Sequence, residues 1–398
     1  MKKLIWIIPL LIVAAALFLT SCSSGVSVNT WPGVATAKDV AYLANGSFIY
    51  AVTSKETAES WRYPSAADST RVFYSAPTVS GDLIVVGSWY PTKVNKVDHY
   101  GLYAIDTTGK EVWSQPFLQA TGRWIASPVI CGDTIFAVNA DQTVYALDLK
   151  GNLISTFTKD DYAKNSEKNT KSYSRVAFWS QPVCDVSNTN VFVGSLNHYL
   201  YAFTLKNDRL EMMWEQPMDA ALTASPVVRE DGKILIGNIN GEFYSLNPTN
   251  GSIDNKVQLQ GGIWAKPAIK DGNIYIGTQT GNVYELSENL KILAGPTVLD
   301  GAILSRGNVV DSGVLFLTDA GSIWNIGFDG KLTSDTPLKQ LATGHFYSDA
   351  VLVSFKDVDN NNNVVDRYKL MAAITQGSEL LYSYNPITNA STAFTPAK

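Results

Sequence analysis

The sequence predicts an all-β protein, a single eight-bladed β-propeller in which each blade is one repeat of the chain. Two observations carry this prediction: a pattern of short β-rich runs recurs along the chain, and Gly, Asn or Asp turns separate the runs. A period of about 40–50 residues with four short strands is typical of a propeller blade, and about 4–8 blades close a ring. No segment of the repeats is long enough for an amphipathic helix.

Each repeat begins at a Ser-x-Pro-like position. The clearest copy starts at Ser225-Pro226, and its runs are separated by Asp231-Gly232 and Asn240-Gly241. These dipeptides are typical hairpin turns between antiparallel strands. The start position recurs at Pro77, Pro128, Pro182, Pro226 and Pro267, and in altered form at Gly307 and Ala350.

The third run of the repeat gives the blade count. Eight copies are recognisable, centred on Tyr50, Tyr103, Tyr145, Tyr201, Tyr244, Tyr284, Trp324 and Tyr382. Seven blades remain the alternative, if residues 31–40 complete the last blade.

The N-terminus has the pattern of a targeting segment. Lys2 and Lys3 precede an apolar stretch, and Leu19-Thr20-Ser21-Cys22 follows it. This arrangement resembles the lipobox of bacterial lipoproteins, which implies a signal peptide over residues 1–21, a lipid on Cys22, a tether over residues 22–30 and a propeller over residues 31–398. A plain secretory signal or a single membrane helix is the alternative. Acylation would anchor the domain to a membrane outside the cytoplasm.

Composition limits which partners and which cellular compartment we expect for the protein. The formal net charge is −5 and the cations are scattered, so we expect no nucleic-acid partner. Beyond Cys22 only Cys131 and Cys184 remain, in corresponding segments of adjacent repeats. They would pair in an oxidising compartment, but we expect free thiols, because inner strands of neighbouring blades should lie farther apart than a disulfide allows.

One repeat identifies the propeller family. Residues 104–113 contain Asp106, Gly109, Lys110 and Trp113 in an order that resembles the Ala-x-Asp-x-x-Thr-Gly-Lys-x-x-Trp motif of pyrroloquinoline-quinone (PQQ) repeats, one residue short. In that family the aromatic residue of the outer strand docks on the next blade. The resemblance implies this role for Trp61, Trp113 and Trp214.

The PQQ-repeat family contains both dehydrogenases and non-enzymatic lipoproteins, and fold alone does not separate them. The dehydrogenases carry a vicinal cysteine pair, a calcium site and a catalytic Asp, and this sequence has no Cys-Cys and no matching acid cluster. We therefore expect no enzyme, no PQQ and no calcium. The lipid-anchored, non-enzymatic form is similar to the B-lipoprotein family of the outer-membrane β-barrel assembly machine.

Propellers bind at the mouth of the central channel, so the residues just before each inner strand are the candidate site. Strand alternation places the residues one and three before each start position on one face. The large and charged members are in the later repeats: Trp179, Gln181, Trp264, Lys266, Arg306, Tyr347 and Asp349. Aromatic planes beside cations suit a glycan, an anionic group or a peptide. The alternative is that the tryptophans wedge blades together and the charges are solvated or paired.

A second candidate lies at 357–366, where Asp357, Asp359 and Asn361 follow the spacing of a calcium loop. Position twelve is Tyr368 rather than an acid, so a long hairpin turn is an equal interpretation.

The sequence thus predicts a lipid-anchored, extracytoplasmic binding or scaffold protein of the cell envelope, at the cell membrane or outer membrane. Its partner would be an envelope protein or a glycan, and the chain would be a monomer or a subunit of a complex. A small PQQ-dependent oxidoreductase is the alternative.

Overall fold

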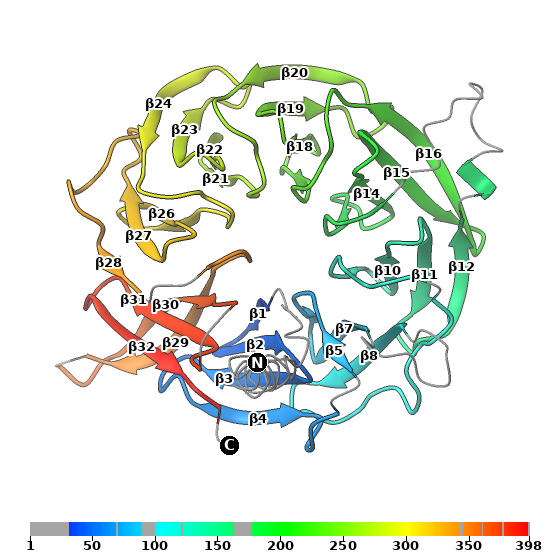
Figure 1. Ribbon diagram of the computed structural model, residues 1–398, viewed down its shortest axis with the longest axis horizontal. Coiled ribbons are helices and arrows are strands. Elements are labelled where there is room, and N and C mark those ends of the chain that lie inside the picture. Colours follow the sequence, from blue (N-terminus) through cyan, green and yellow to red (C-terminus); the bar gives the residue numbers. More distant parts are fainter. Residues whose placement is uncertain are drawn as a thin grey trace, which may run out of the picture.

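Eight four-stranded antiparallel sheets form a closed ring in the computed structural model (Figure 1). The structure describes residues 32–68, 71–89, 100–120, 122–158, 160–162, 177–341, 345–359, 361–375 and 378–396. Each sheet is built from one continuous stretch of chain, and we number the blades 1 to 8 in chain order. The eight-bladed prediction is confirmed. The seven-bladed alternative is wrong, because the strand at Gly33–Ala37 pairs within blade 1 rather than completing blade 8.

The first four blades run from Gly33 to Pro217. Their strands are β1 (Gly33–Ala37), β2 (Val40–Asn45), β3 (Phe48–Thr53) and β4 (Glu59–Tyr63); β5 (Val72–Phe73), β6 (Thr78–Ser80), β7 (Leu83–Trp89) and β8 (Tyr100–Asp106); β9 (Val129–Cys131), β10 (Thr134–Val138), β11 (Val144–Asp148) and β12 (Leu153–Phe157); β13 (Val183–Cys184), β14 (Asn190–Gly194), β15 (Tyr199–Lys206) and β16 (Arg209–Pro217).

The last four blades run from Val227 to Phe394. Their strands are β17 (Val227–Val228), β18 (Ile234–Gly237), β19 (Glu242–Leu246) and β20 (Ile253–Gln258); β21 (Ala268–Lys270), β22 (Asn273–Gly277), β23 (Asn282–Leu286) and β24 (Ile292–Val298); β25 (Asn308–Val310), β26 (Gly313–Leu317), β27 (Ser322–Ile326) and β28 (Lys339–Gln340); β29 (Val351–Val358), β30 (Val364–Ala373), β31 (Leu381–Asn385) and β32 (Ala390–Phe394).

Blade 2 departs from the common plan. Both β5 and β6 pair with β7, so together they form its inner edge. No regular outer strand follows β8 within the described residues of this blade, and isolated bridges at Glu111 and Phe117 take its place.

The core lies between blades rather than at the centre of the ring. The described residues form eight buried apolar clusters, and each cluster joins one pair of adjacent blades. This follows from sheets whose strands alternate between two buried faces. Every blade therefore depends on both neighbours for its burial.

Side chains close the ring where the chain ends meet. Tyr50 of blade 1 packs edge-on against Phe394 of blade 8, with ring centroids 5.5 Å apart. The Thr57 hydroxyl lies 2.9 Å from that of Ser383 and 2.8 Å from that of Thr392. No strand crosses between the two blades in the described part of the chain, so packing and hydroxyl contacts hold the ring shut.

The docking role implied for the three tryptophans is confirmed. Each ring lies over a glycine turn of the following blade, and each indole Nε1 donates to a backbone carbonyl there: Trp61 to Thr107 O (3.0 Å), Trp113 to Leu149 O (2.9 Å) and Trp214 to Pro248 O (2.9 Å). Gly251 has φ +72°, and a Cβ on it would lie 2.6 Å from the Trp214 ring. Only glycine permits both the turn and the close approach.

The expectation of free thiols is wrong. Cys131 and Cys184 form a disulfide with an S–S distance of 2.04 Å and a Cα–Cα distance of 5.7 Å. The two residues end the innermost strands β9 and β13, which lie in contact because the blades converge toward the channel. The premise that inner strands stay beyond disulfide reach does not hold at this radius.

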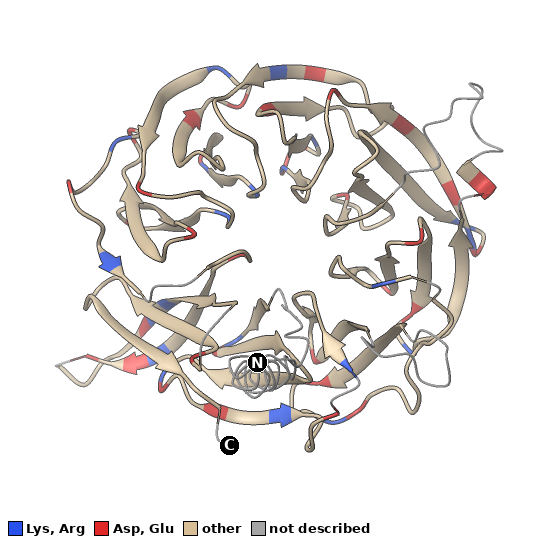
Figure 2. Cartoon of the chain, viewed as in Figure 1, with Lys and Arg blue, Asp and Glu red and all other residues tan. Residues whose placement is uncertain are grey.

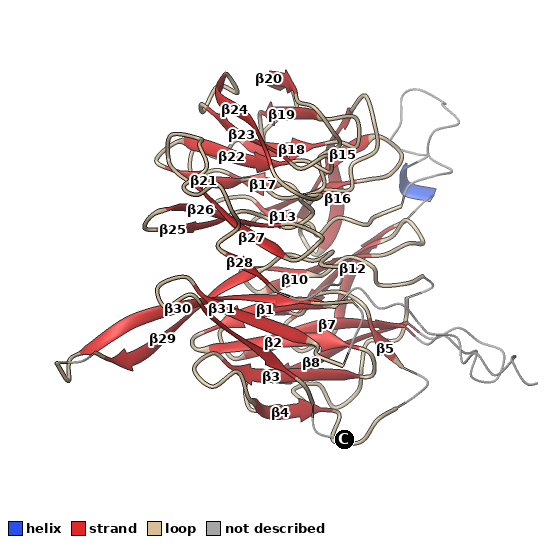
Figure 3. Ribbon diagram, turned by 60° about the vertical axis from the view of Figure 1, so that its left-hand side comes forward, coloured by secondary structure: helices blue, strands red, loops and turns tan. Residues whose placement is uncertain are grey.

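The segment at 357–366 is the tip of a long hairpin, β29–β30, that projects from the ring (Figure 3). Asp359 Oδ1 accepts the backbone N–H groups of Asn361 and Asn363, each at 2.8 Å. Asp357 pairs with Lys55 at 3.7 Å, and Asp366 with Lys356 at 2.6 Å. The hairpin interpretation is therefore confirmed, and each of these carboxylates is engaged by its own neighbours.

Residues 1–31, which include Cys22, lie outside the described residues. Across the rest of the chain, the described residues contain no helix that is both long enough and apolar enough to cross a bilayer.

Candidate functional site

The channel mouth is built from the residues that precede each innermost strand. In blades 4, 6, 7 and 8 these strands are β13, β21, β25 and β29. A cavity of about 410 Å³ opens there, and its wall contains all seven candidate residues: Trp179, Gln181, Trp264, Lys266, Arg306, Tyr347 and Asp349. The structure thus brings together the set that strand alternation placed on one face.

Three of these side chains form a polar bridge across the channel, which we call the channel bridge: Gln181, Lys266 and Asp349. Lys266 Nζ donates to Gln181 Oε1 at 3.1 Å and pairs with Asp349 Oδ2 at 3.2 Å. Gln181 belongs to blade 4 and Asp349 to blade 8, which are opposite in an eight-membered ring, so the bridge spans its diameter.

Both ends of the channel bridge are fixed to backbone. Gln181 Nε2 donates to the carbonyl of Pro128 at 3.1 Å, and Asp349 Oδ1 accepts the backbone N–H of Arg306 at 2.9 Å. The side chains of Lys266 and Asp349 are 24% and 26% exposed. The bridge is therefore a partly buried, hydrogen-bonded element of the fold, and the paired-charge interpretation holds for these two residues.

Electrostatics keep the single carboxylate of the cavity ionised. Burial acts to raise the pKa of Asp349, but the charges of Lys266 and Arg306 and the hydrogen bonds from both residues outweigh it, and the pKa lies below its usual value. The cavity wall carries two cations and one carboxylate. Its charge is therefore +1, although the whole chain is acidic.

The aromatic residues lie on either side of blade 7. Trp264 and Tyr347, together with Leu304, Ala302 and Gln279, line a second cavity of about 240 Å³, which shares three lining residues with the first. Tyr347 stacks on His345 with ring centroids 5.2 Å apart and planes 9° apart. Trp179 of blade 4 is 39% exposed, so it does not act as a buried wedge.

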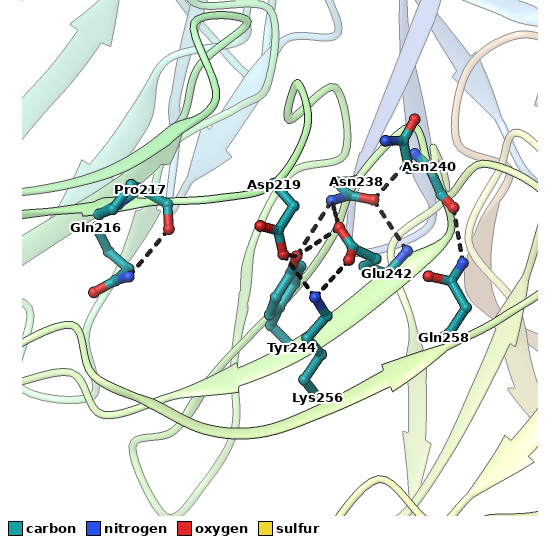
Figure 4. Close-up of polar contacts among 9 residues, drawn as sticks. All are labelled: Gln216, Pro217, Asp219, Asn238, Asn240, Glu242, Tyr244, Lys256 and Gln258. Carbon is teal, nitrogen blue, oxygen red and sulfur yellow. Dashed lines mark hydrogen bonds and ion pairs between the residues drawn. The ribbon is translucent and has the colours of Figure 1, made fainter.

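A polar cluster that the sequence did not predict lies on blade 5 (Figure 4). Lys256 Nζ contacts Asp219 Oδ2 at 2.6 Å and Glu242 Oε1 at 2.5 Å, and the Tyr244 hydroxyl donates to Glu242 Oε2 at 2.7 Å. Burial and then the two carboxylates raise the pKa of Tyr244. Asn238 donates to Glu242 Oε2 at 2.6 Å.

The same cluster has a partial signal in the repeat. The Asn directly after the second strand approaches the Tyr of the third strand in blade 3 (Asn139 and Tyr145, 3.4 Å) and in blade 5 (Asn238 and Tyr244, 3.4 Å). In blade 4 this position is Ser195, and Asn197, two residues later, donates to Tyr201 at 2.8 Å. The Asn–Tyr pair thus recurs at one repeat position in blades 3 and 5, and blade 5 adds the three charges.

The channel wall supplies few carboxylate ligands for calcium. Calcium takes about 6–8 oxygen ligands, whereas the cavity wall offers one carboxylate, Asp349, whose two oxygens are already engaged. No three His, Cys, Asp or Glu side chains gather among the residues that the structure describes. The sequence also lacks the adjacent cysteines of the dehydrogenases.

Both signs of charge are interspersed around the ring (Figure 2). The fold, the docked tryptophans and their glycine turns define a β-propeller of PQQ-like repeats. The family model described as "Outer membrane protein assembly factor BamB" matches residues 22–217 and 211–293, and the chain belongs to this family.

Two solved structures share the fold. The computationally designed Ika8 protein has a TM-score of 0.65 and 13% sequence identity, with 90% of this chain and 96% of that chain covered. BamB from Moraxella catarrhalis has a TM-score of 0.54 and 16% identity, with 73% of this chain and 82% of that chain covered. No curated protein matches the sequence.

Proposed function

We propose that the protein is a non-enzymatic binding scaffold of the cell envelope, anchored outside the cytoplasm by a lipid on Cys22. It acts by presenting the channel mouth to another envelope protein. Membership of the BamB family carries this proposal, because the family's description names an assembly factor of the outer membrane.

The chemistry of the channel supports a binding role. The channel bridge joins Gln181, Lys266 and Asp349 to one another and to backbone, so its polar groups are held by the protein itself. General acid–base catalysis needs a group placed to exchange a proton with a substrate, and a nucleophile needs an adjacent base. The seven candidate residues offer aromatic surface and positive charge instead.

The disulfide supports the extracytoplasmic location. Disulfides persist in oxidising compartments and are rare in the cytosol. The bond between Cys131 and Cys184 joins two adjacent blades, so it would stabilise the mature domain after export.

Crosslinking in the native membrane tests the proposal. Intact lipidated protein is crosslinked, purified and compared with the triple variant Trp264→Ala, Lys266→Ala, Arg306→Ala. We expect a defined envelope protein that is captured by the wild type and lost in the variant.

A matched control removes one aromatic residue, one Lys and one Arg from the outer surface: Phe328→Ala, Lys331→Ala, Arg209→Ala. This control should retain the partner. Recovery of no partner by the wild type, together with tight binding of PQQ and calcium to the purified domain, would instead favour the oxidoreductase.

A further inference from the structure

The cavity of about 240 Å³ between Trp264 and Tyr347, which we call the aromatic slot, has the size and lining of a side-chain pocket. Leu304, Ala302 and Gln279 complete its wall, so the surface is almost entirely carbon. A dry apolar cavity of about 150 Å³ is enough to take benzene. The slot therefore has room for one phenyl or indole ring.

The slot lies beside Arg306, a cation that acts on the Asp349 carboxylate through its charge but forms no ion pair with it. Arg306 follows Leu304 by two residues, and both residues line the larger cavity. Arg306 is exposed in the channel wall. Within the described residues, its guanidinium takes part in no hydrogen bond or ion pair, and only its backbone N–H contacts Asp349.

Two of the three charged side chains in the cavity wall already form an ion pair with each other. Lys266 and Asp349 hold each other in the channel bridge, which leaves Arg306 as the cation available to a ligand. A guanidinium recognises a carboxylate through two parallel N–H···O bonds. The channel mouth therefore offers a ligand an apolar pocket for one ring, with the guanidinium of Arg306 at its edge to bind a carboxylate.

We propose that the aromatic slot binds an aromatic side chain of an extended partner segment and that Arg306 pairs with an Asp or Glu next to it. This proposal rests on the proposed scaffold function and names the chemistry that the channel mouth recognises. The larger cavity is also lined by Ser127, Thr223 and Ser225 of blades 3 and 5, whose hydroxyls add polar groups to the channel mouth.

A glycan fits the slot poorly. A sugar ring stacks on one aromatic face and keeps hydroxyls around its whole rim, and a carbon-lined pocket would leave those hydroxyls without partners. Leaving a polar group without a partner in an apolar site is unfavourable. Trp264, Leu304 and Tyr347 give the slot an apolar lining, so it favours an apolar ring over a sugar.

Peptide titration tests the proposal on the purified mature domain. The probe is acetyl-Gly-Phe-Asp-Gly-amide, and the matched probes replace Phe by Ser or Asp by Asn. Binding is followed by tryptophan indole NMR signals up to about 5 mM peptide, which detects affinities near the millimolar range. We expect the Phe-Asp probe to bind at least about fivefold more tightly than either matched probe.

Two variants separate the ring pocket from the charge. Arg306→Gln should weaken the Phe-Asp probe by about fivefold to tenfold and leave the Phe-Asn probe unchanged. Ala302→Leu fills the slot and should weaken both aromatic probes. Arg209→Gln, which removes an exposed Arg from β16, is the matched control and should bind like the wild type.

The outcomes distinguish this proposal from the scaffold function. Equal binding of the Ser-Asp and Phe-Asp probes would show that charge attraction alone drives binding, which would overturn the slot proposal. The absence of any NMR shift at the highest peptide concentration would also overturn it. If Arg306→Gln with Ala302→Leu still captures the crosslinked envelope protein, the scaffold function stands and the slot proposal fails. Loss of capture together with loss of probe binding supports both.

Discussion

Replacing Lys266 by Met should destabilise the propeller in a way that depends on pH. The substitution keeps most of the side-chain volume but removes the cation at the centre of the channel bridge. Breaking a buried ion pair costs about 3–5 kcal/mol, whereas an exposed pair contributes about 0–1 kcal/mol. Lys266 and Asp349 are 24% and 26% exposed, so we expect a loss of about 1–3 kcal/mol near neutral pH.

The effect on the melting temperature is small because the domain is large. An unfolding entropy of about 2.1 cal/mol/K per residue over roughly 370 residues gives about 0.8 kcal/mol/K. The expected loss therefore lowers Tm by only about 1–4 °C. Lys270→Met removes an exposed cation from the same blade, where Lys270 pairs with Asp271, and should change Tm by less than about 1 °C.

The pH dependence supplies the diagnostic signature. In the wild type the folded-state pKa of Asp349 is depressed, so its contribution to stability is present above the unfolded value of about 4 and is lost as the pH falls through the folded value. Without Lys266, burial is opposed by Arg306 alone and the pKa of Asp349 rises. The stability deficit of Lys266→Met should therefore grow as the pH increases from about 3.5 to 7.

Thermal denaturation of the wild type, Lys266→Met and Lys270→Met across this pH range measures the deficit, and carboxyl NMR follows Asp349 directly. A deficit that is the same at every pH, or that Lys270→Met reproduces, would refute the assignment of the channel bridge as a coupled ion pair. An unchanged pKa of Asp349 in the variant would refute it independently.

Three further substitutions test the contacts between and within blades. Cys131→Ala, or reduction of its bond to Cys184, should lower the free energy of unfolding by about 2–4 kcal/mol; denaturation with and without dithiothreitol measures this, and two reactive thiols in the native protein would contradict it. Trp214→Ala should cost about 2–4 kcal/mol in the same assay, because the ring is packed against the next blade, and a loss under about 1 kcal/mol would show that docking contributes little. Tyr244→Phe should cost about 0.5–1.5 kcal/mol through its lost hydroxyl bonds, and equal stability would mean that water replaces them.

The repeat made the blade structure predictable from sequence. Recurrence of the same turn and strand residues specifies each sheet locally. The docking role of Trp61, Trp113 and Trp214 came from the resemblance to PQQ repeats rather than from the recurrence itself. The ring itself also follows, because sheets with two apolar faces must pack on both sides. Closure between Tyr50 and Phe394 did not follow, because the terminal blades have the weakest pattern.

The sequence predictions that were wrong or missing depend on distances between blades, which local sequence patterns do not encode. Cys131 and Cys184 occupy equivalent repeat positions, and their pairing depends on how closely two inner strands converge at the channel. The channel bridge was not predicted for the same reason. Gln181, Lys266 and Asp349 are far apart in sequence, and only the diameter of the ring decides that their side chains meet. Alternation predicted which face they share but not which residues they touch.

The repeats offer an internal comparison that separates structure from recognition. At the position one residue before the repeat start, blades 2, 3 and 5 carry Ala76, Ser127 and Ser225, so a small residue satisfies the fold there. The large residues at the same position of other blades are therefore not required to form a blade. Gln181, Lys266 and Asp349 form the channel bridge. Arg306 adds charge that lowers the pKa of Asp349, but among the described residues its guanidinium forms no hydrogen bond or ion pair, so it is the large side chain at this position that remains able to bind a ligand.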